Sequence, residues 1–170
     1  QPSHKFVDIG ANVGAYTILA SKVIKANSIA FEPVPETANR LKDQIYLNRI
    51  ENSVEVRNIG IGNENSLLYF TNNSDTTNKV NIKGEDVNTI QVEVKTLDSQ
   101  VSSVDPLFLK IDVEGFEHNV IQGAQTILSS DNLIALIIEL NGSGEEFGHT
   151  NEEIHQKLIS HNLIPITYNP

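Results

Sequence analysis

The chain of 170 residues contains no cysteine, no methionine and no tryptophan. The absence of cysteine excludes a disulfide framework, a thiolate zinc site and a cysteine nucleophile. Basic residues are also scarce, since 12 Lys and Arg stand against 22 Asp and Glu, and the formal net charge is −10. Nucleic acids and anionic membranes attract basic patches, so this charge disfavours both as partners.

Long hydrophobic runs are absent as well. The sequence contains no stretch of 18 or more apolar residues and no signal-like apolar segment, so we expect a cytoplasmic location without membrane insertion. The length fits one domain, covering residues 1–170, with a core of its own. Because the chain begins with Gln1 and has no methionine, we expect it to be an excerpt of a longer reading frame.

Five short apolar runs, rich in β-branched and aromatic residues, predict strands. They are residues 6–8, 29–32, 54–58, 107–112 and 133–139. The last two runs are almost continuously apolar, which is typical of strands buried on both faces of a parallel sheet.

Helical patterns separate these runs. They lie at 15–23, with Ala15, Ile18, Leu19 and Val23 on the expected buried face, at 35–45, at 116–128, and from a capping box at Thr150 onward. This alternation predicts an α/β fold with a doubly wound sheet. Residues 62–94 break the alternation: they are polar, with apolar runs at 67–70 and 90–94, and predict an insertion of short antiparallel strands.

The predicted strands end in polar side chains. In an open parallel sheet, ligands bind beyond the carboxyl ends of the strands. The side chains at these ends should therefore form one acidic, hydrogen-bonding rim that favours a cationic or hydroxyl-rich ligand. They are Asp8, Glu32, Asn58, Asp112 and Glu139.

The first turn, residues 8–14, is the most specific motif. Gly10 allows a sharp turn and Gly14 a close helix, while Asn12 tolerates a left-handed conformation. The fingerprint of dinucleotide-binding proteins requires glycine at position 12, so this sequence gives less support to a phosphate-binding turn. A tight turn that binds no ligand remains an alternative. Glu32 can accept both hydroxyls of a ribose, or it can be an acid at a helix start.

Four strings, in this order, resemble one protein family. They are residues 7–14 (VDIGANVG), 31–33 (FEP), 96–99 (TLDS) and 109–117 (LKIDVEGFE). Together they are similar to the FkbM family of S-adenosylmethionine-dependent methyltransferases, and the resemblance covers about residues 6–140.

The resemblance implies a class I, Rossmann-like methyltransferase fold. Its mostly parallel sheet would carry the small antiparallel β insertion, its methyl donor would be S-adenosylmethionine, and its acceptor would be a hydroxyl of a sugar, glycan or secondary metabolite. The chain departs from the class where it begins just before the first strand and ends before a final hairpin. We therefore expect truncation at both ends, with residues 163–168 as one strand of that hairpin.

The resemblance also implies the residues that bind the donor. Asp8, Gly10, Asn12 and Gly14 would surround its methionine moiety, with Ala11 in the same turn. Glu32 would bind the ribose, Asn58 and Ile59 would lie at the adenine edge, and Asp112 would lie near the donor amino group or the acceptor.

A hydroxyl acceptor calls for a general base. Asp112, Glu114, Glu117 and His118 are candidates where the fourth strand turns into its helix, and the pKa of histidine suits a base near neutrality. Alternatively, His118 is a solvent-exposed residue in the first turn of the helix and takes no part in catalysis. Asp112 and Glu114 could instead ligate a divalent cation, but no third ligand follows at a recognisable spacing, so we expect no metal.

Two alternative functions belong to protein classes other than methyltransferases. A nicotinamide-dependent oxidoreductase would share the architecture, but glycine is missing at position 12 and no Tyr-x-x-x-Lys pair occurs. A non-catalytic nucleoside-binding domain would keep the site without turnover. For an enzyme, we expect a small-molecule or saccharide acceptor to contact residues 62–94 and 141–148, because loops at the ligand edge set specificity.

Overall fold

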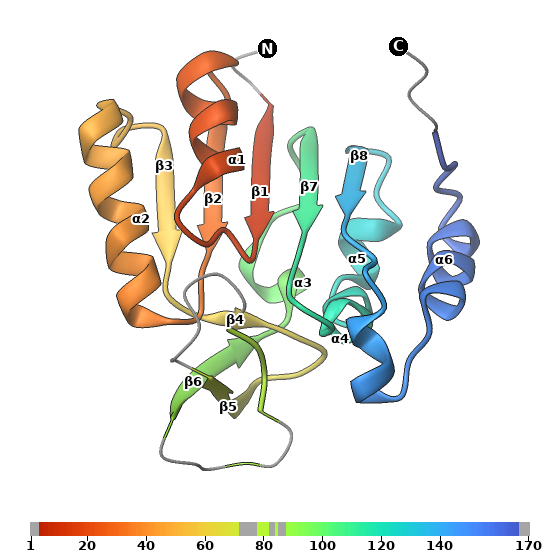
Figure 1. The fold of residues 1–170 in the computed structure, drawn as a ribbon. Coiled ribbons are helices and arrows are strands. Elements are labelled where there is room, and N and C mark those ends of the chain that lie inside the picture. Colours follow the sequence, from red (N-terminus) through yellow and green to blue (C-terminus); the bar gives the residue numbers. More distant parts are fainter. Residues whose placement is uncertain (1–3, 72–77, 82–83, 85–87, 167–170) are drawn as a thin grey trace.

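The structure is a computed structural model and describes residues 4–71, 78–81, 84 and 88–166. Its main sheet has five strands in the order β3-β2-β1-β7-β8, and every neighbouring pair is parallel (Figure 1). These are the five predicted strands: β1 (Lys5–Ile9), β2 (Asn27–Phe31), β3 (Val54–Arg57), β7 (Leu107–Ile111) and β8 (Leu133–Ile138).

The strand order reverses between β1 and β7. From β1 the chain proceeds outward to β2 and β3, and it then returns to the other side of β1 for β7 and β8. The connections on the two sides leave the sheet in opposite directions, so a crevice opens at the carboxyl ends of β1 and β7. The doubly wound α/β architecture predicted from the sequence is thus confirmed.

Helices lie on both faces of the sheet and on its β8 side (Figure 1). The helices are α1 (Ala15–Ile18), α2 (Pro35–Asn48), α3 (Leu97–Gln100), α4 (Glu117–Gln122), α5 (Gln125–Leu128) and α6 (Asn151–Ser160). α2 begins at Pro35 as predicted, and Leu41 and Ile45 are buried with Ala30 of β2. The predicted capping box is present at the start of α6, where Thr150 and Glu153 bond each other's backbone N–H groups.

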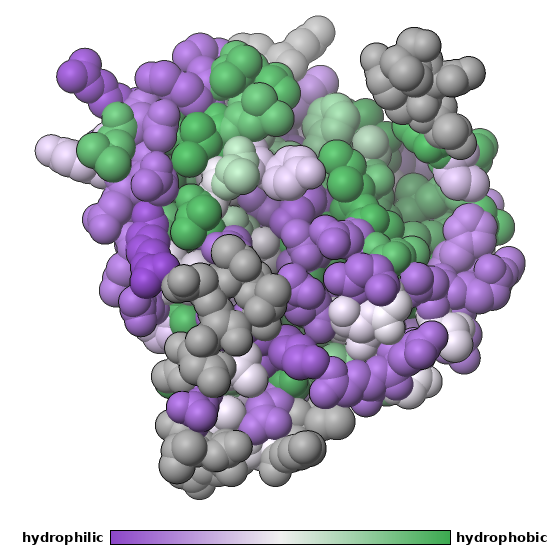
Figure 2. All heavy atoms as spheres, viewed as in Figure 1, coloured by the Kyte–Doolittle hydropathy of each residue, from purple (hydrophilic) through white to green (hydrophobic). Residues whose placement is uncertain are grey.

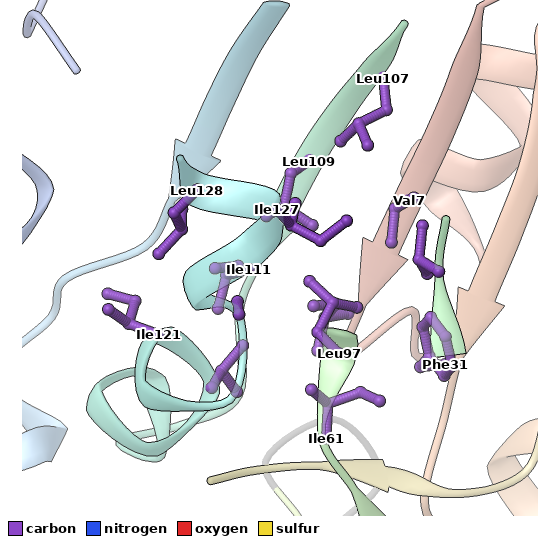
Figure 3. Packing of buried hydrophobic residues seen from close by; sticks show 14 of the residues in the cluster. Val7, Phe31, Ile61, Leu97, Leu107, Leu109, Ile111, Ile121, Ile127 and Leu128 are labelled. Atoms are coloured by element: carbon purple, nitrogen blue, oxygen red, sulfur yellow. The ribbon is translucent and has the colours of Figure 1, made fainter. Parts of the chain in front are cut away.

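The larger core lies on the sheet face opposite α2. Alternate residues of β1 and β7 point into it, and Leu107, Leu109 and Ile111 are at most 1% exposed. Figure 3 shows them beside Ile127 and Leu128 of α5. The residues between them, including Asp8 and Lys110, therefore lie on the α1 side of the sheet, because side chains alternate along a strand.

The predicted buried face of residues 15–23 is wrong at Ala15, Leu19 and Val23, which are exposed, although Ile18 packs partly buried against the core. Leu19 and Val23 are 49% and 66% exposed, whereas Thr17, Ala20 and Ser21 are buried. α1 passes into a π-helix, η1 (Leu19–Val23), which shifts the helical phase. Figure 2 shows hydrophobic side chains gathered on the surface over this segment.

Partners of the buried polar side chains explain this reversal. The Thr17 hydroxyl donates to Asp8 Oδ2 at 2.6 Å, and the hydroxyls of Ser21 and Ser28 share a hydrogen bond of 2.7 Å. A buried hydroxyl is tolerated when it is hydrogen-bonded, so this polar face can turn toward the sheet.

The single helix predicted over 116–128 is also wrong, because α4 and α5 are separated at Gly123 and Ala124. A Cβ atom at Gly123 would lie 1.9 Å from the carbonyl oxygen of Gly62. The helix is interrupted where its backbone packs directly on this neighbouring segment. Its predicted inward residues Phe116, Val120, Ala124, Ile127 and Leu128 are nevertheless all buried.

The insertion forms a second sheet of three strands. They are β4 (Gly60–Ile61), β5 (Ser66–Thr71) and β6 (Thr89–Lys95), in the order β4-β6-β5. β5 and β6 are antiparallel as predicted, but β4 pairs with β6 in parallel, so the sheet is mixed. The prediction placed the insertion from residue 62 and therefore missed β4; residues 72–77, 82–83 and 85–87 lie outside the described residues.

The carboxyl-terminal strand predicted over 163–168 is not found in the part that is described, since residues 163–166 form no strand, and Thr167 and Tyr168 lie outside it. Across the described ranges, no helix combines the length and apolar character needed to cross a bilayer. The cytoplasmic location stays a prediction.

Candidate functional site

A pocket of about 260 Å³ opens where the strand order reverses. The turn after β1, the start of α1 and the carboxyl end of β2 form one wall, while β4 and the turn after β7 form another. Phe70 of β5 and Asn78 complete the wall on the insertion side. The pocket thus lies at the place predicted for the ligand of a doubly wound sheet.

The turn after β1 depends on left-handed backbone conformations. The φ angles of Gly10, Asn12 and Gly14 are 75°, 51° and 94°. A Cβ atom at Gly10 would lie 1.8 Å from the carbonyl oxygen of Asp112, and one at Gly14 would lie 2.4 Å from Leu41 Cδ1. Gly10 therefore lets two strand ends approach each other, and Gly14 lets α1 approach α2.

Glu32 connects this turn to the start of α2. Its Oε2 accepts the N–H of Asn12 at 2.9 Å, and its Oε1 accepts the N–H of Val34 at 3.0 Å. The side chain lines the pocket although the residue is only 6% exposed. Burial raises the pKa of Glu32 to about 7, against the opposing effect of the two N–H groups.

Lys110 lines the pocket and was not among the site residues predicted from the sequence. Its Nζ is 3.1 Å from the carbonyl oxygen of Gly10, 3.1 Å from Asp112 Oδ2 and 3.5 Å from Asp8 Oδ1. The Tyr16 ring covers it, with 5.3 Å between Nζ and the ring centroid. Burial raises the pKa of Asp8, while Lys110 and the Thr17 hydroxyl oppose that shift. The sequence feature that could have identified Lys110 as a site residue is its position as a lysine within an otherwise apolar strand.

The turn after β7 carries a second strained segment. Glu114 has a φ of 52° and Gly115 a φ of 105°. Glu117 holds this turn, because its Oε1 accepts the N–H groups of Val113 at 3.2 Å and Gly115 at 3.1 Å. Glu117, one of the base candidates, is thus buried and engaged with backbone. Glu114 lines the pocket, and burial and then the Asp112 charge raise its pKa.

The pocket brings together most of the predicted site residues. Those that line it are Gly10, Ala11, Asn12, Glu32, Ile59, Asp112 and Glu114. Asp8 and Gly14 are not among the lining residues: Asp8 pairs with the lining residue Lys110, and Gly14 packs against Leu41. The Asn58 side chain donates to the carbonyl oxygens of Glu32 at 2.8 Å and Pro33 at 2.9 Å, so it shapes the end of β2.

His118 is not among the lining residues. Its ring stacks on His149, with 3.5 Å between the centroids, and burial followed by the His149 charge lowers its pKa. The structure places this ring beside the segment before α6, and its role as a base stays a prediction. Among the described residues, no group of three or more His, Asp or Glu side chains is arranged to hold a metal ion.

Known proteins resemble the chain over most of its length. Residues 8–163 match the family model of the methyltransferase FkbM domain. The chain is 30% identical over 142 residues to the hexuronic acid methyltransferase AglP of Haloferax volcanii, an alignment that covers 79% of this chain and 54% of the relative. It is 29% identical over 142 residues to methyltransferase 1 of Beauveria bassiana, covering 69% and 57%.

A solved structure has the same fold. The crystal structure of an FkbM methyltransferase from Methylobacillus flagellatus KT superposes with a TM-score of 0.67 at 19% identity, covering 94% of this chain and 37% of the other. The chain spans about half the length of the curated relatives it matches. The family match extends from the first turn to beyond α6, and the chain therefore belongs to the FkbM methyltransferase family.

Proposed function

We propose that residues 1–170 form one methyltransferase domain that moves a methyl group from S-adenosylmethionine to a hydroxyl of a sugar, glycan or secondary metabolite. The observation that carries this proposal is the position of Glu32. Its carboxylate lines a pocket at the strand-order reversal, directly beside the left-handed turn at Gly10. An acid at this position suits two adjacent ribose hydroxyls.

The residues present fit this donor. Gly10 leaves no room for a Cβ atom, so backbone approaches the pocket closely. Ile59 and Ile61 offer apolar surface on the opposite wall, where an adenine ring would pack. The Gly10 carbonyl oxygen and Asp112 Oδ2 each lie 3.1 Å from Lys110 Nζ, and we assign these two oxygens to the donor's amino group. Among the described lining residues, three acids, Glu32, Asp112 and Glu114, stand against one basic residue, Lys110, and this acidic excess favours a positively charged sulfonium.

A carbohydrate acceptor is supported by a relative and by the pocket. The Haloferax volcanii relative is named for methylation of a hexuronic acid, which is a sugar. The insertion contributes Phe70 and Asn78 to the pocket lining, and Phe116 adds a second aromatic ring. Aromatic and amide side chains together suit a ring that carries several hydroxyls.

S-adenosylmethionine supplies an activated methyl group, so the protein has to align the acceptor and remove its proton. We assign the proton acceptor to Glu114. Asp112 is held by Lys110 at 3.1 Å, whereas Glu114 lines the pocket with a raised pKa, which brings a carboxylate closer to the basicity that suits a neutral solution. Its ionised form is the base, so the transfer rate should fall as pH falls through this pKa.

Calorimetry tests the donor first. We expect S-adenosylhomocysteine and S-adenosylmethionine to bind and NAD not to bind. Tight binding of NAD without binding of S-adenosylhomocysteine would support the oxidoreductase alternative and overturn the proposal. Binding of S-adenosylhomocysteine without methyl transfer in a mass-shift screen of polyols and glycans would favour the non-catalytic alternative.

Glu114→Gln tests the base once an acceptor is known. Methyl transfer should fall by roughly 10²–10⁴-fold, the usual contribution of a positioned base, and the acidic limb of the pH–rate profile should disappear. Affinity for S-adenosylhomocysteine should change little. Glu36→Gln is the matched control, since Glu36 is an exposed residue of α2 paired with Arg40. An unchanged transfer rate in Glu114→Gln would remove Glu114 from the reaction.

A further inference from the structure

Lys110 is a buried cation in the wall of the pocket. It is 5% exposed and lies in β7 between the apolar residues Leu109 and Ile111. Lysine is almost never fully buried unless it is paired. Here its ammonium group donates to the Gly10 carbonyl oxygen and forms ion pairs with Asp112 and Asp8, with Nζ 3.1 Å from Asp112 Oδ2 and 3.5 Å from Asp8 Oδ1.

The three partners of the ammonium group come from both strands that border the strand-order reversal. Asp8 is the register partner of Lys110 on β1, the Gly10 carbonyl belongs to the following turn, and Asp112 follows β7. Backbone N–H groups of Gly10 and Ala11 also bond the Phe31 carbonyl, at 3.1 and 3.0 Å, so the turn is held from the β2 side as well. The ammonium group thus contacts both the Gly10 carbonyl and the Asp112 carboxylate.

We propose that Lys110 is a positioning residue that holds the Gly10 carbonyl and the Asp112 carboxylate in the geometry that receives the amino-acid portion of the donor. This inference rests on the proposed function, because it takes S-adenosylmethionine as the ligand of the pocket. The ribose end is held differently, since Glu32 is bonded by the backbone N–H groups of Asn12 and Val34. Removal of the ammonium group should therefore affect one end of the ligand and spare the other.

Two related ligands separate the two ends. S-adenosylhomocysteine carries the amino-acid portion, whereas 5′-methylthioadenosine keeps the adenosine and the sulfur without it. In Lys110→Met, calorimetry should show the dissociation constant of S-adenosylhomocysteine rising about tenfold or more, as expected when charge-assisted hydrogen bonds lose their organisation. The constant for 5′-methylthioadenosine should stay within about twofold of wild type.

A matched control and a second variant complete the test. Lys95→Met removes a lysine of the small sheet that pairs with Glu93 at 2.6 Å, and it should alter neither affinity. Lys110→Met leaves Asp8 as a buried charge without its cation, which threatens folding. The double variant Asp8→Asn/Lys110→Met removes both charges together, and the same selective loss should be measured there.

The outcomes are distinct. Equal weakening of both ligands would show that Lys110 only supports the fold around the site, and unchanged affinities would show that it does nothing for the ligand; either result overturns the inference. If wild-type protein binds neither ligand, the proposed function fails before the role of Lys110 is reached. Selective loss of S-adenosylhomocysteine affinity would support both the proposed function and the positioning role of Lys110.

Discussion

The buried carboxyl of Glu32 should make the protein less stable as the pH rises. Its pKa is about 7 in the folded state and near the ordinary 4.5 in the unfolded state. Between these pH values the folded state binds more protons than the unfolded state, so the contribution of Glu32 is fully present below pH 4.5 and is lost as the pH rises through 7. The shift corresponds to roughly 3 kcal/mol.

Glu32→Gln isolates this contribution from those of the other acids. The glutamine amide has the shape of the protonated acid, but its single oxygen can accept only one of the two N–H groups of Asn12 and Val34, which lowers the stability of the variant equally at all pH values. From pH 4.5 to pH 8 the free energy of unfolding of the variant should therefore rise relative to wild type by up to roughly 3 kcal/mol, because the variant never carries the buried charge. Urea unfolding followed by circular dichroism measures this without tryptophan, which the chain lacks.

The comparison with an exposed acid controls for general charge effects. Glu36→Gln on the surface of α2 should differ from wild type by less than about 0.5 kcal/mol at either pH, as exposed pairs usually do. If wild type instead gains stability over Glu32→Gln between pH 4.5 and pH 8, the N–H groups of Asn12 and Val34 outweigh burial, and the reasoning is refuted.

Two further predictions concern backbone geometry. Gly10→Ala should abolish binding of S-adenosylhomocysteine and lower the midpoint of thermal unfolding by several degrees, because the new Cβ atom would lie 1.8 Å from the Asp112 carbonyl oxygen. Gly84→Ala is the control: Gly84 also has a positive φ, but no neighbouring atom of the described residues lies within 4 Å of the new Cβ atom, so the midpoint should fall far less. Asp98→Ala should lower the free energy of unfolding by about 1–2 kcal/mol in urea, because its carboxylate accepts the N–H groups of Thr126 and Ile127 at the start of α5. A change below about 0.3 kcal/mol would contradict the Asp98 prediction.

The strands and the place of the ligand pocket could be predicted because they depend on local patterns. Continuous apolar runs at 107–112 and 133–139 are typical of buried parallel strands, and the structure has β7 and β8 there. The polar residues at the strand ends then follow from chain direction alone. The place of the pocket needed one additional rule, that ligands of an open parallel sheet bind beyond the carboxyl ends of the strands. The order of the strands came from the structure.

The face of α1 and the break at Gly123 could not be predicted, because each depends on a partner far along the chain. Thr17 and Ser21 are ordinary polar residues until Asp8 and Ser28 are placed against them. Gly123 is an ordinary helix residue until the backbone of Gly62 is packed on it. Helical periodicity contains no information about such partners.

The same limit applies to the site. The Lys110 ammonium group and the Gly10 carbonyl are 100 positions apart in the sequence but 3.1 Å apart in space. The sequence offered Glu117 and Glu114 as equivalent acids, yet the structure uses Glu117 to bond backbone N–H groups and directs Glu114 to the pocket wall. The sequence shows that both residues are acids, whereas their different roles depend on where the fold places each side chain.

The two walls of the pocket differ in how freely evolution can alter them. β5 and β6 form their own antiparallel ladder, and among the described strands it is the short β4 that pairs with them, through β6. Substitutions or added length between β5 and β6 therefore leave the register of the five-stranded sheet intact, and a longer loop costs little entropy. The opposite wall has no such freedom at Gly10, where any side chain meets backbone. Members of the family that keep this arrangement should diversify through the β5–β6 hairpin while the glycine turn stays fixed.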